Sequence, residues 1–144
     1  MTITERHTFG WNLETQLKPI FEVLHNVTLI KTEKRYDCLD FIGVDLNIEL
    51  KSRVGISTAY PDWLLPVCKA TKAERSDKPT YFYYFWKSDN KLFKLKYDKE
   101  LFDTFKRQYP FFNRNQEHFY IPADAWEYVG VVDLNNNCLV GSAV

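Results

Sequence analysis

The segment VDLNIELKSR (residues 44–53) carries reactive side chains at alternate positions. Glu49, Lys51 and Arg53 recur at every second residue, and leucine or isoleucine fills the alternate positions from 46 to 50. Because strand side chains point to the two faces in turn, the pattern predicts a half-buried strand whose polar residues share one face. A carboxylate beside an ammonium group can bind a cation and polarise water, as metal-assisted hydrolysis requires.

The chain just before this strand supplies a second carboxylate. The segment YDCLDFI is predicted to be a strand that folds back as a hairpin. A turn centred at residues 44–45 pairs Phe41 with Ile48, which keeps the apolar sides of both strands together. The same register places Asp40 opposite Glu49.

Asp40 and Glu49 are predicted to need a positive charge between them. Directly paired strand residues have Cβ atoms about 4.5–5.5 Å apart, so two carboxylates there repel each other. Hard cations such as Mg²⁺ prefer carboxylate, water and phosphate oxygens, and one would relieve that repulsion. Lys51 would then orient a water molecule or balance the charge of a phosphate. The arrangement suits phosphodiester hydrolysis.

In the residues LDF (39–41) and IELKSR (48–53), the chain resembles the PD-(D/E)XK nuclease superfamily, and it is also similar to small uncharacterised nuclease-like proteins of viruses and phages. The literal Pro-Asp is absent, since a leucine precedes Asp40. The resemblance implies a restriction-endonuclease-like fold, α/β or mixed α+β, with a central mixed sheet flanked by helices. It implies that Asp40 and Glu49 bind Mg²⁺ or Mn²⁺ and act in catalysis with Lys51. The implied activity is that of a DNA endonuclease, with RNA the less common substrate.

Two positions of the acidic set have alternatives. Proteins of this superfamily often carry another glutamate on a helix before the strands, and Glu14 and Glu22 both flank the apolar stripe of the first predicted helix. We expect Glu14 to be the metal ligand, because the resembling proteins carry theirs early in that helix. Asp37 competes with Asp40, but it lies three residues earlier and should point to the opposite face.

Basic residues after the motif are candidates for nucleic-acid binding. Arg53 directly follows the predicted strand, and Lys69 lies on the predicted helix that follows. Both would contact phosphates, which position a nucleic acid without reading its sequence. A homodimer is one way for so short a chain to gain specificity. The alternative hypothesis is a catalytically inactive module of the same fold that binds nucleic acid or protein.

Hydrophobic periodicity predicts the other elements. Residues 11–26 read as a helix, with Asn12 as a candidate N-cap and Pro19 as an awkward interior residue. Strands are expected over 27–32, 36–42 and 45–52, followed by a short helix interrupted by Pro66 within 60–73. Next come a hairpin of 80–86 with 91–98 and a helix over 98–109 capped by Asp98. Residues 118–134 are expected to form a strand, a helical turn opened by Pro122 and a last strand.

The second hairpin has an aromatic and basic face. A turn at residues 89–90 would pair Tyr83 with Lys96 and Phe85 with Lys94, on the face opposite the core. Such a surface can stack bases and hold phosphates. We favour the simpler interpretation, in which the aromatic rings pack beneath a helix and the lysines extend past them to water.

Composition limits the class of protein. The 144 residues suit one domain, and 45% of them are apolar, as in globular proteins. The 19 basic and 19 acidic residues cancel, which argues against nonspecific coating of nucleic acid. The 3 cysteines are widely spaced and are expected to be buried apolar residues. With no apolar stretch for a secretion signal or a bilayer span, we expect a soluble intracellular protein, in the host cytoplasm if it is viral, and no membrane partner.

Overall fold

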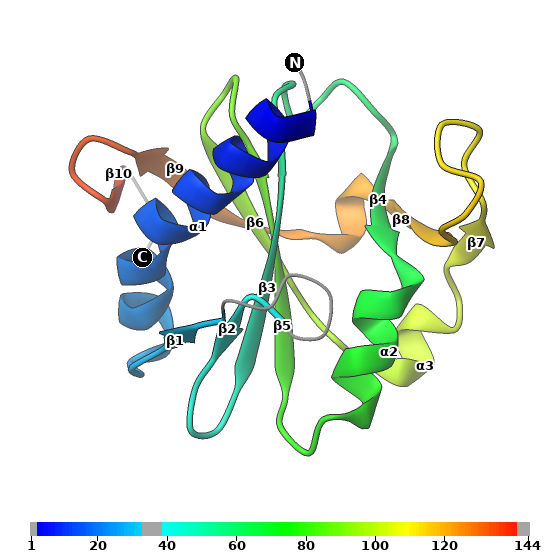
Figure 1. Cartoon of the computed structure of the whole chain (residues 1–144), viewed down its shortest axis with the longest axis horizontal. Helices are drawn as coiled ribbons and strands as arrows, with labels where there is room; N and C mark the ends of the chain where they lie inside the picture. Colours follow the sequence, from blue (N-terminus) through cyan, green and yellow to red (C-terminus); the bar gives the residue numbers. More distant parts are fainter. Residues whose placement is uncertain (1–2, 33–38, 141–144) are drawn as a thin grey trace.

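The computed structural model describes residues 3–32 and 39–140, with side chains from residue 12 onward. Figure 1 shows α1 on one side of the strands and α2 and α3 on the other. The elements in chain order are α1 (Ile3–His25), β1 (Ile30–Lys31), β2 (Phe41–Ile42), β3 (Asn47–Arg53), β4 (Asp62–Pro66), α2 (Val67–Arg75), β5 (Thr80–Trp86), β6 (Lys91–Lys96), α3 (Lys99–Phe102), β7 (Lys106–Gln108), β8 (His118–Pro122), the 3-10 turn η1 (Ala123–Ala125), β9 (Glu127–Asp133) and β10 (Cys138–Val140).

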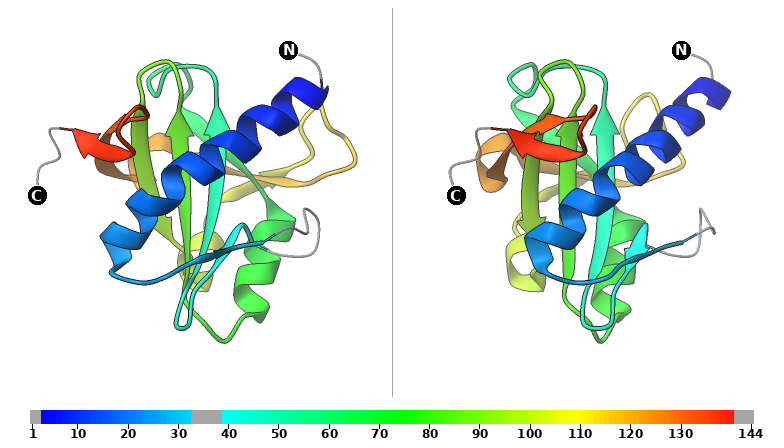
Figure 2. Two further views of the ribbon diagram at one scale, coloured as in Figure 1. Left: turned by 60° about the vertical axis from the view of Figure 1, so that its left-hand side comes forward. Right: turned by 90° about the vertical axis from the view of Figure 1, so that its left-hand side faces the viewer.

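The strands form a large mixed sheet and a small antiparallel sheet. The large sheet has seven strands in the order β1-β2-β3-β5-β6-β9-β10, and the small sheet has three in the order β4-β8-β7. β3 and β5 run parallel, and the other neighbours in the large sheet are antiparallel. Figure 2 shows α1 running diagonally across one face of this sheet. The fold is therefore mixed α+β, with a curled sheet of many strands.

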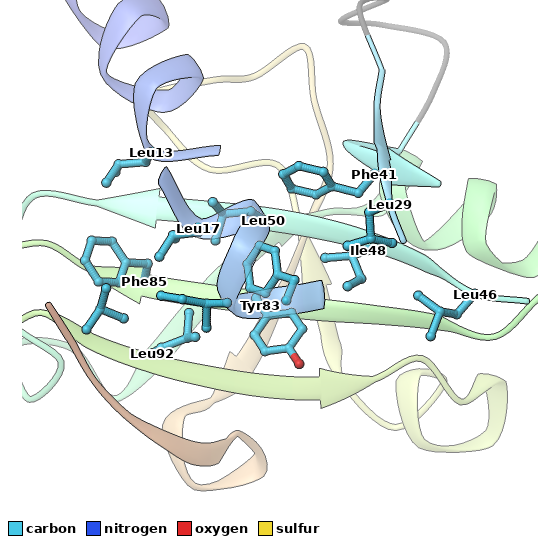
Figure 3. Close-up of a cluster of buried hydrophobic side chains, with 13 residues drawn as sticks. Leu13, Leu17, Leu29, Phe41, Leu46, Ile48, Leu50, Tyr83, Phe85 and Leu92 are labelled. Atoms are coloured by element: carbon cyan, nitrogen blue, oxygen red, sulfur yellow. The ribbon is translucent and has the colours of Figure 1, made fainter. Parts of the chain in front are cut away.

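One hydrophobic core lies between α1 and the large sheet. Its helix side is a stripe with the helical period: Leu13, Leu17, Ile20 and Phe21, all buried. Its sheet side, drawn in Figure 3, includes Leu46, Ile48 and Leu50 of the β3 segment and Tyr83 and Phe85 of β5. This packing fixes α1 over β3 and β5. A polar residue beside the apolar stripe is consequently held close to the sheet.

The opposite face of the large sheet packs against α2, α3 and the small sheet. Alternate residues of β5 divide between the two faces, so Phe82, Tyr84 and Trp86 enter this second core. β3 aligns with β5 residue by residue, and Glu49 lies beside Phe82. The polar face of β3 therefore points toward α2 and the small sheet.

α1 begins earlier than the sequence predicted. It starts at Ile3 and continues through Pro19 to His25, so the prediction that Asn12 caps the helix is wrong. Pro19 is exposed, whereas Leu17 and Ile20 beside it are buried. Burial of apolar side chains on both sides of the proline offsets the hydrogen bond that proline removes.

The register of the first hairpin is confirmed. Phe41 pairs with Ile48, and Ile42 pairs with Asn47. The strand before it is shorter than predicted, because the residues of 27–32 that pair are only those of β1. The first hairpin is thus the part of the fold in which alternation of apolar residues fixed the pairing.

The register of the second hairpin was predicted wrongly by two residues. Tyr83 pairs with Lys94, and Phe85 pairs with Leu92. A shift of two residues keeps every side chain on its predicted face. Tyr83 and Phe85 are buried against α1, as the simpler interpretation required.

The segment predicted as a short helix over 60–73 is a strand followed by a helix. The chain forms β4 up to Pro66, and α2 begins at Val67. Pairing of β4 with β8 decides the structure of this apolar run, which is too short for its sequence to distinguish a strand from a helix.

The helix predicted over 98–109 is limited to the four residues of α3. Its cap is confirmed, because the carboxylate of Asp98 accepts the N–H of Glu100 at 3.0 Å. The chain then leaves the helix and pairs with β8 as β7. The strand, the helical turn opened by Pro122 and the last strand that were predicted within 118–134 are confirmed as β8, η1 and β9. β10 was not predicted.

The cysteine prediction is wrong where the structure tests it. Cys68 and Cys138 are free and exposed. Cys38 lies outside the described residues. Within residues 3–32 and 39–140, no helix is long and apolar enough to cross a membrane.

Candidate carboxylate and lysine site

Asp40 and Glu49 lie together where β2 begins beside β3. The backbone N–H of Asp40 donates to Oε1 of Glu49 at 3.0 Å. The N–H of Leu50 donates to Oδ2 of Asp40 at 2.8 Å. Each carboxylate is therefore tied to the backbone of the other strand. Glu49 is buried, with 6% of its surface exposed.

α1 brings Glu14 to the same place. Its Oε2 lies 3.3 Å from Nζ of Lys31 on β1, and its carboxyl group lies near that of Asp40. Burial and the neighbouring Asp40 raise the pKa of Glu14 to about 9. Glu14 therefore tends to keep its proton, which limits the repulsion between its carboxyl group and the carboxylate of Asp40.

Of the two alternatives that the sequence left open, the structure describes only Glu22, which has other partners. Glu22 accepts the N–H of Leu29 at 2.8 Å through Oε2, and the same oxygen lies 3.3 Å from Nζ of Lys18. Glu22 therefore anchors the chain that follows α1. Asp37 lies outside the described residues.

Lys69 of α2 forms an ion pair with Glu49. Nζ of Lys69 lies 3.1 Å from Oε2 of Glu49, and both side chains are mostly buried. Burial and the charge of Asp40 raise the pKa of Glu49 to about 8, against the opposing effect of Lys69. Burial lowers the pKa of Lys69, but the charges of Glu49 and Asp40 outweigh it and raise the pKa above its ordinary value. Lys69, predicted as a phosphate contact, neutralises a carboxylate in this structure.

Lys51 and Arg53 continue the polar face of β3. They align with Tyr84 and Trp86 of β5. Burial, and next the charge of Arg53, lower the pKa of Lys51 to about 8. Among the residues that the structure describes, neither cation forms an ion pair with a carboxylate. Arg53 instead donates through Nε to the hydroxyl of Tyr84 at 3.3 Å.

His118 borders the same surface, which its isolated position in the sequence did not indicate. It lies on β8, is 3% exposed, and its Nδ1 lies 2.9 Å from the carbonyl oxygen of Gln116. Burial lowers the pKa of His118, and the nearby charges of Lys51 and Arg53 lower it further. Folding of the small sheet against the large one brings it there. Nothing in the local sequence predicts that contact.

The carboxylate oxygens suit a hard cation, although they do not form a ready cage. Within the described ranges, no three or more His, Cys, Asp or Glu side chains are arranged to hold a metal ion. Both oxygens of Glu49 are engaged, and Oδ2 of Asp40 accepts a backbone N–H. A bound Mg²⁺ or Mn²⁺ would displace the proton that the raised pKa of Glu14 favours. Oxygen donors of this type, completed by water and phosphate, are those that Mg²⁺ prefers.

The face of the second hairpin does not join this site. Tyr83 lies beneath α1, and its hydroxyl is 2.7 Å from Nε2 of His25. Lys94 pairs with Glu127 at 3.2 Å. The candidate site, as far as the structure describes it, is accordingly formed by β1, the β2–β3 hairpin, α1, α2 and β8.

Comparison of the chain with models of known protein families, with curated protein sequences and with solved structures finds no match.

Proposed function

We propose that the protein is a metal-dependent nuclease of PD-(D/E)XK type, with DNA as its preferred substrate. Lys51 lies on the same face of β3 as Glu49. The observation that carries the proposal is that Asp40 lies near two other carboxyl groups: its backbone N–H donates to Glu49, and its charge helps to raise the pKa of Glu14. The three carboxyl groups come from three different elements and are mostly removed from water. A buried cluster of like charges destabilises a protein unless a cation or a proton neutralises it.

The arrangement of the elements supports the proposal. The resemblance implied a mixed central sheet with helices on both sides and a glutamate on the helix before the strands. α1 covers one face of the large sheet and α2 the other. Glu14 lies on the first helix and reaches Asp40. A restriction-endonuclease-like core accounts for all of these features together.

Each group then has a chemical task. Glu14, Asp40 and Glu49 would hold Mg²⁺ or Mn²⁺, which supplies Lewis acidity at the scissile phosphate. Lys51, on the same face, would orient the attacking water, and Arg53 would contact a phosphate. Lys69 would leave Glu49 when the cation binds, since both compete for the same oxygen. Dimerisation and endonucleolytic cutting remain predictions.

One observation favours the alternative, a catalytically inactive module of the same fold. Lys69 already neutralises Glu49 at 3.1 Å, as it would in a site that binds no metal. Such a module would bind nucleic acid through Lys51 and Arg53 and would cleave nothing.

Cleavage with Mn²⁺ separates the two functions. The wild-type protein is incubated with end-labelled single-stranded DNA, duplex DNA and RNA, with Mn²⁺ or with EDTA. Glu49→Gln keeps the size of the side chain and removes its charge. Asp45→Asn, exposed at the turn of the same hairpin, is the control.

We expect Mn²⁺-dependent cleavage by the wild type and by Asp45→Asn, and none by Glu49→Gln. Nucleic-acid binding by Glu49→Gln should persist. Binding without cleavage by the wild type, under every one of these conditions, would instead support the inactive module.

A further inference from the structure

An aromatic pocket begins where the candidate site ends. It has a volume of about 400 Å³, within the range of cavities that bind small organic ligands. Arg53 and Asp62 lie in its lining. Most of its wall is aromatic: Tyr60, Trp63, Tyr84, Trp86, Phe111 and Phe112.

The pocket is continuous with the polar face of β3. Lys51 aligns with Tyr84, and Arg53 aligns with Trp86, across the parallel pairing of β3 with β5. Arg53 lies two residues beyond Lys51, so about 6–7 Å farther along the strand, a distance that one nucleotide can span. The Nε group of Arg53 donates to the hydroxyl of Tyr84 at 3.3 Å, which holds the cation against the pocket wall. A phosphate near Lys51 would therefore lie close to the pocket mouth.

The pocket combines buried rings at its base with exposed rings at its rim, the latter being Tyr60, Phe111 and Phe112. Trp86 is stacked with Tyr84 at a centroid distance of 5.3 Å and with Tyr60 at 6.3 Å. Tyr60 is 60% exposed and Phe111 is 84% exposed, although large aromatic side chains are normally covered. A planar ring that entered beside them would bury these faces. Bases stack on such side chains whatever their sequence.

The polar groups of the lining match a nucleobase better than a phosphate. Asp62 is an acceptor that can receive the N–H groups of a base, and its negative charge would repel a phosphate inside the pocket. Arg53, next to Lys51, supplies positive charge for the phosphate instead. The pocket thus divides a nucleotide into a base, held by the rings, and a phosphate, held on β3.

We propose that this pocket binds an unpaired nucleobase next to the phosphate that is cleaved, so that the substrate is single-stranded or locally unpaired nucleic acid. The choice of a nucleic acid as the ligand rests on the proposed nuclease function. In a paired duplex each base is stacked between its neighbours, so it cannot reach the pocket without being extruded from the helix. The pocket would thereby make the protein prefer unpaired nucleic acid without a separate recognition domain.

Equilibrium binding tests the pocket separately from catalysis. Fluorescence anisotropy in EDTA measures the affinity of the full chain for a 12-nucleotide single strand, for the corresponding blunt duplex, and for a 12-nucleotide strand with abasic residues throughout. The pocket variants are Tyr60→Ala and Phe111→Ala, which remove exposed rings. Tyr60→Phe keeps the ring. Tyr109→Ala removes a ring that is 54% exposed but does not line the pocket. Circular dichroism melting confirms that each variant is folded.

We expect each pocket variant to weaken single-strand binding by about five- to one-hundred-fold, the range found when a base-stacking ring is removed. Tyr60→Phe and Tyr109→Ala should bind like the wild type. The abasic strand should bind weakly to every protein, with no further loss in Tyr60→Ala.

Three results would overturn the pocket. The first is wild-type affinity for the single strand in both alanine variants, and the second is equal binding of the abasic strand and the normal strand. The third is a change in self-association alone, measured by sedimentation, which would assign the pocket to a second copy of the chain. If Mn²⁺-dependent cleavage persists in such variants, the nuclease stands and the pocket fails. If single-strand binding depends on the pocket but no cleavage occurs, the pocket stands and the nuclease fails.

Discussion

The backbone N–H of Asp40 donates to Oε1 of Glu49 at 3.0 Å, so two acidic residues on neighbouring strands are held together by the backbone of one of them. The carboxylate of Asp40 in turn accepts the N–H of Leu50. These bonds fix both side chains beside Glu14 of α1 and Lys69 of α2. The fold therefore holds several ionisable groups with shifted pKa values close together, an arrangement that is common at functional sites.

Replacing Glu49 should change how stability depends on pH. The pKa of Glu49 is raised from its ordinary value of 4.5 to about 8, so the folded state holds a proton that the unfolded state releases above pH 4.5. In EDTA, the free energy of unfolding of the wild type should fall as pH rises from 4.5 to about 8, by up to about 1.4 kcal/mol per pH unit from this group. Glu49→Gln should remove this contribution. Calorimetry at pH 5, 6.5 and 8 measures it, and parallel curves for the two proteins would contradict it.

Mn²⁺ should stabilise the folded protein and release protons. The cation is expected to displace the protons that Glu14 and Glu49 hold because of their raised pKa values, so its effect should be greater at pH 8 than at pH 5.5. A cation at one hundred times its dissociation constant adds about 2.7 kcal/mol, which raises Tm by about 5–10 °C in a chain of this size. Thermal melting with and without Mn²⁺ measures the shift. Asp40→Asn should lose it and Asp45→Asn should keep it; an equal shift in both would argue against this site.

Removing the amine of Lys51 should affect cleavage more than binding. Lys51→Met should lower the rate of cleavage by about 100- to 10,000-fold, the usual contribution of a side chain that assists proton transfer. Lys51→Arg should not restore the rate, because a guanidinium keeps its proton and has a different shape. Single-turnover cleavage and anisotropy measure the two effects. Lys96→Met, at an exposed position on β6, is the control. Recovery of the rate in Lys51→Arg would show that charge alone suffices.

Lys69 should serve as a substitute for the cation in the metal-free protein. Lys69→Met leaves Glu49 without its ion pair, so the free energy of unfolding in EDTA at pH 8 should fall by about 1–3 kcal/mol. Added Mn²⁺ should restore more stability to this variant than it adds to the wild type. Denaturant unfolding with and without Mn²⁺ tests both statements. Arg75→Met, exposed at the end of α2, should change neither value.

The central hairpin was predictable because two independent signals agree. Alternating leucine and isoleucine fixed which face of β3 is buried, and a short turn fixed the pairing of Phe41 with Ile48. In the second hairpin, alternation of apolar residues was present, but no short turn fixed the pairing. A register two residues away puts the same residues on the same faces. The longer turn up to Asn90, which has a positive φ of 52°, selects the observed pairing.

The residues that the sequence did not assign to the site come from contacts between distant segments. Lys31 meets Glu14 because β1 pairs with β2 beneath α1. His118 reaches Lys51 and Arg53 through the small sheet, whose edge strand β7 is entirely polar and exposed and carries no strand signal in its sequence. Lys69 was named as a phosphate contact, and only its distance to Glu49 revealed its partner. Local patterns predict faces and turns, and they do not predict which faces will pack together.

The most direct test of the metal site is a crystal soaked in Mn²⁺ and measured at a wavelength where manganese scatters anomalously. We predict one strong anomalous peak at about 2.0–2.6 Å from oxygens of Asp40 and of Glu14 or Glu49, with Nζ of Lys69 withdrawn from Glu49. An undisturbed pair of Lys69 with Glu49, and no peak at these carboxylates even at a Mn²⁺ concentration high enough to saturate a metal site, would contradict the account.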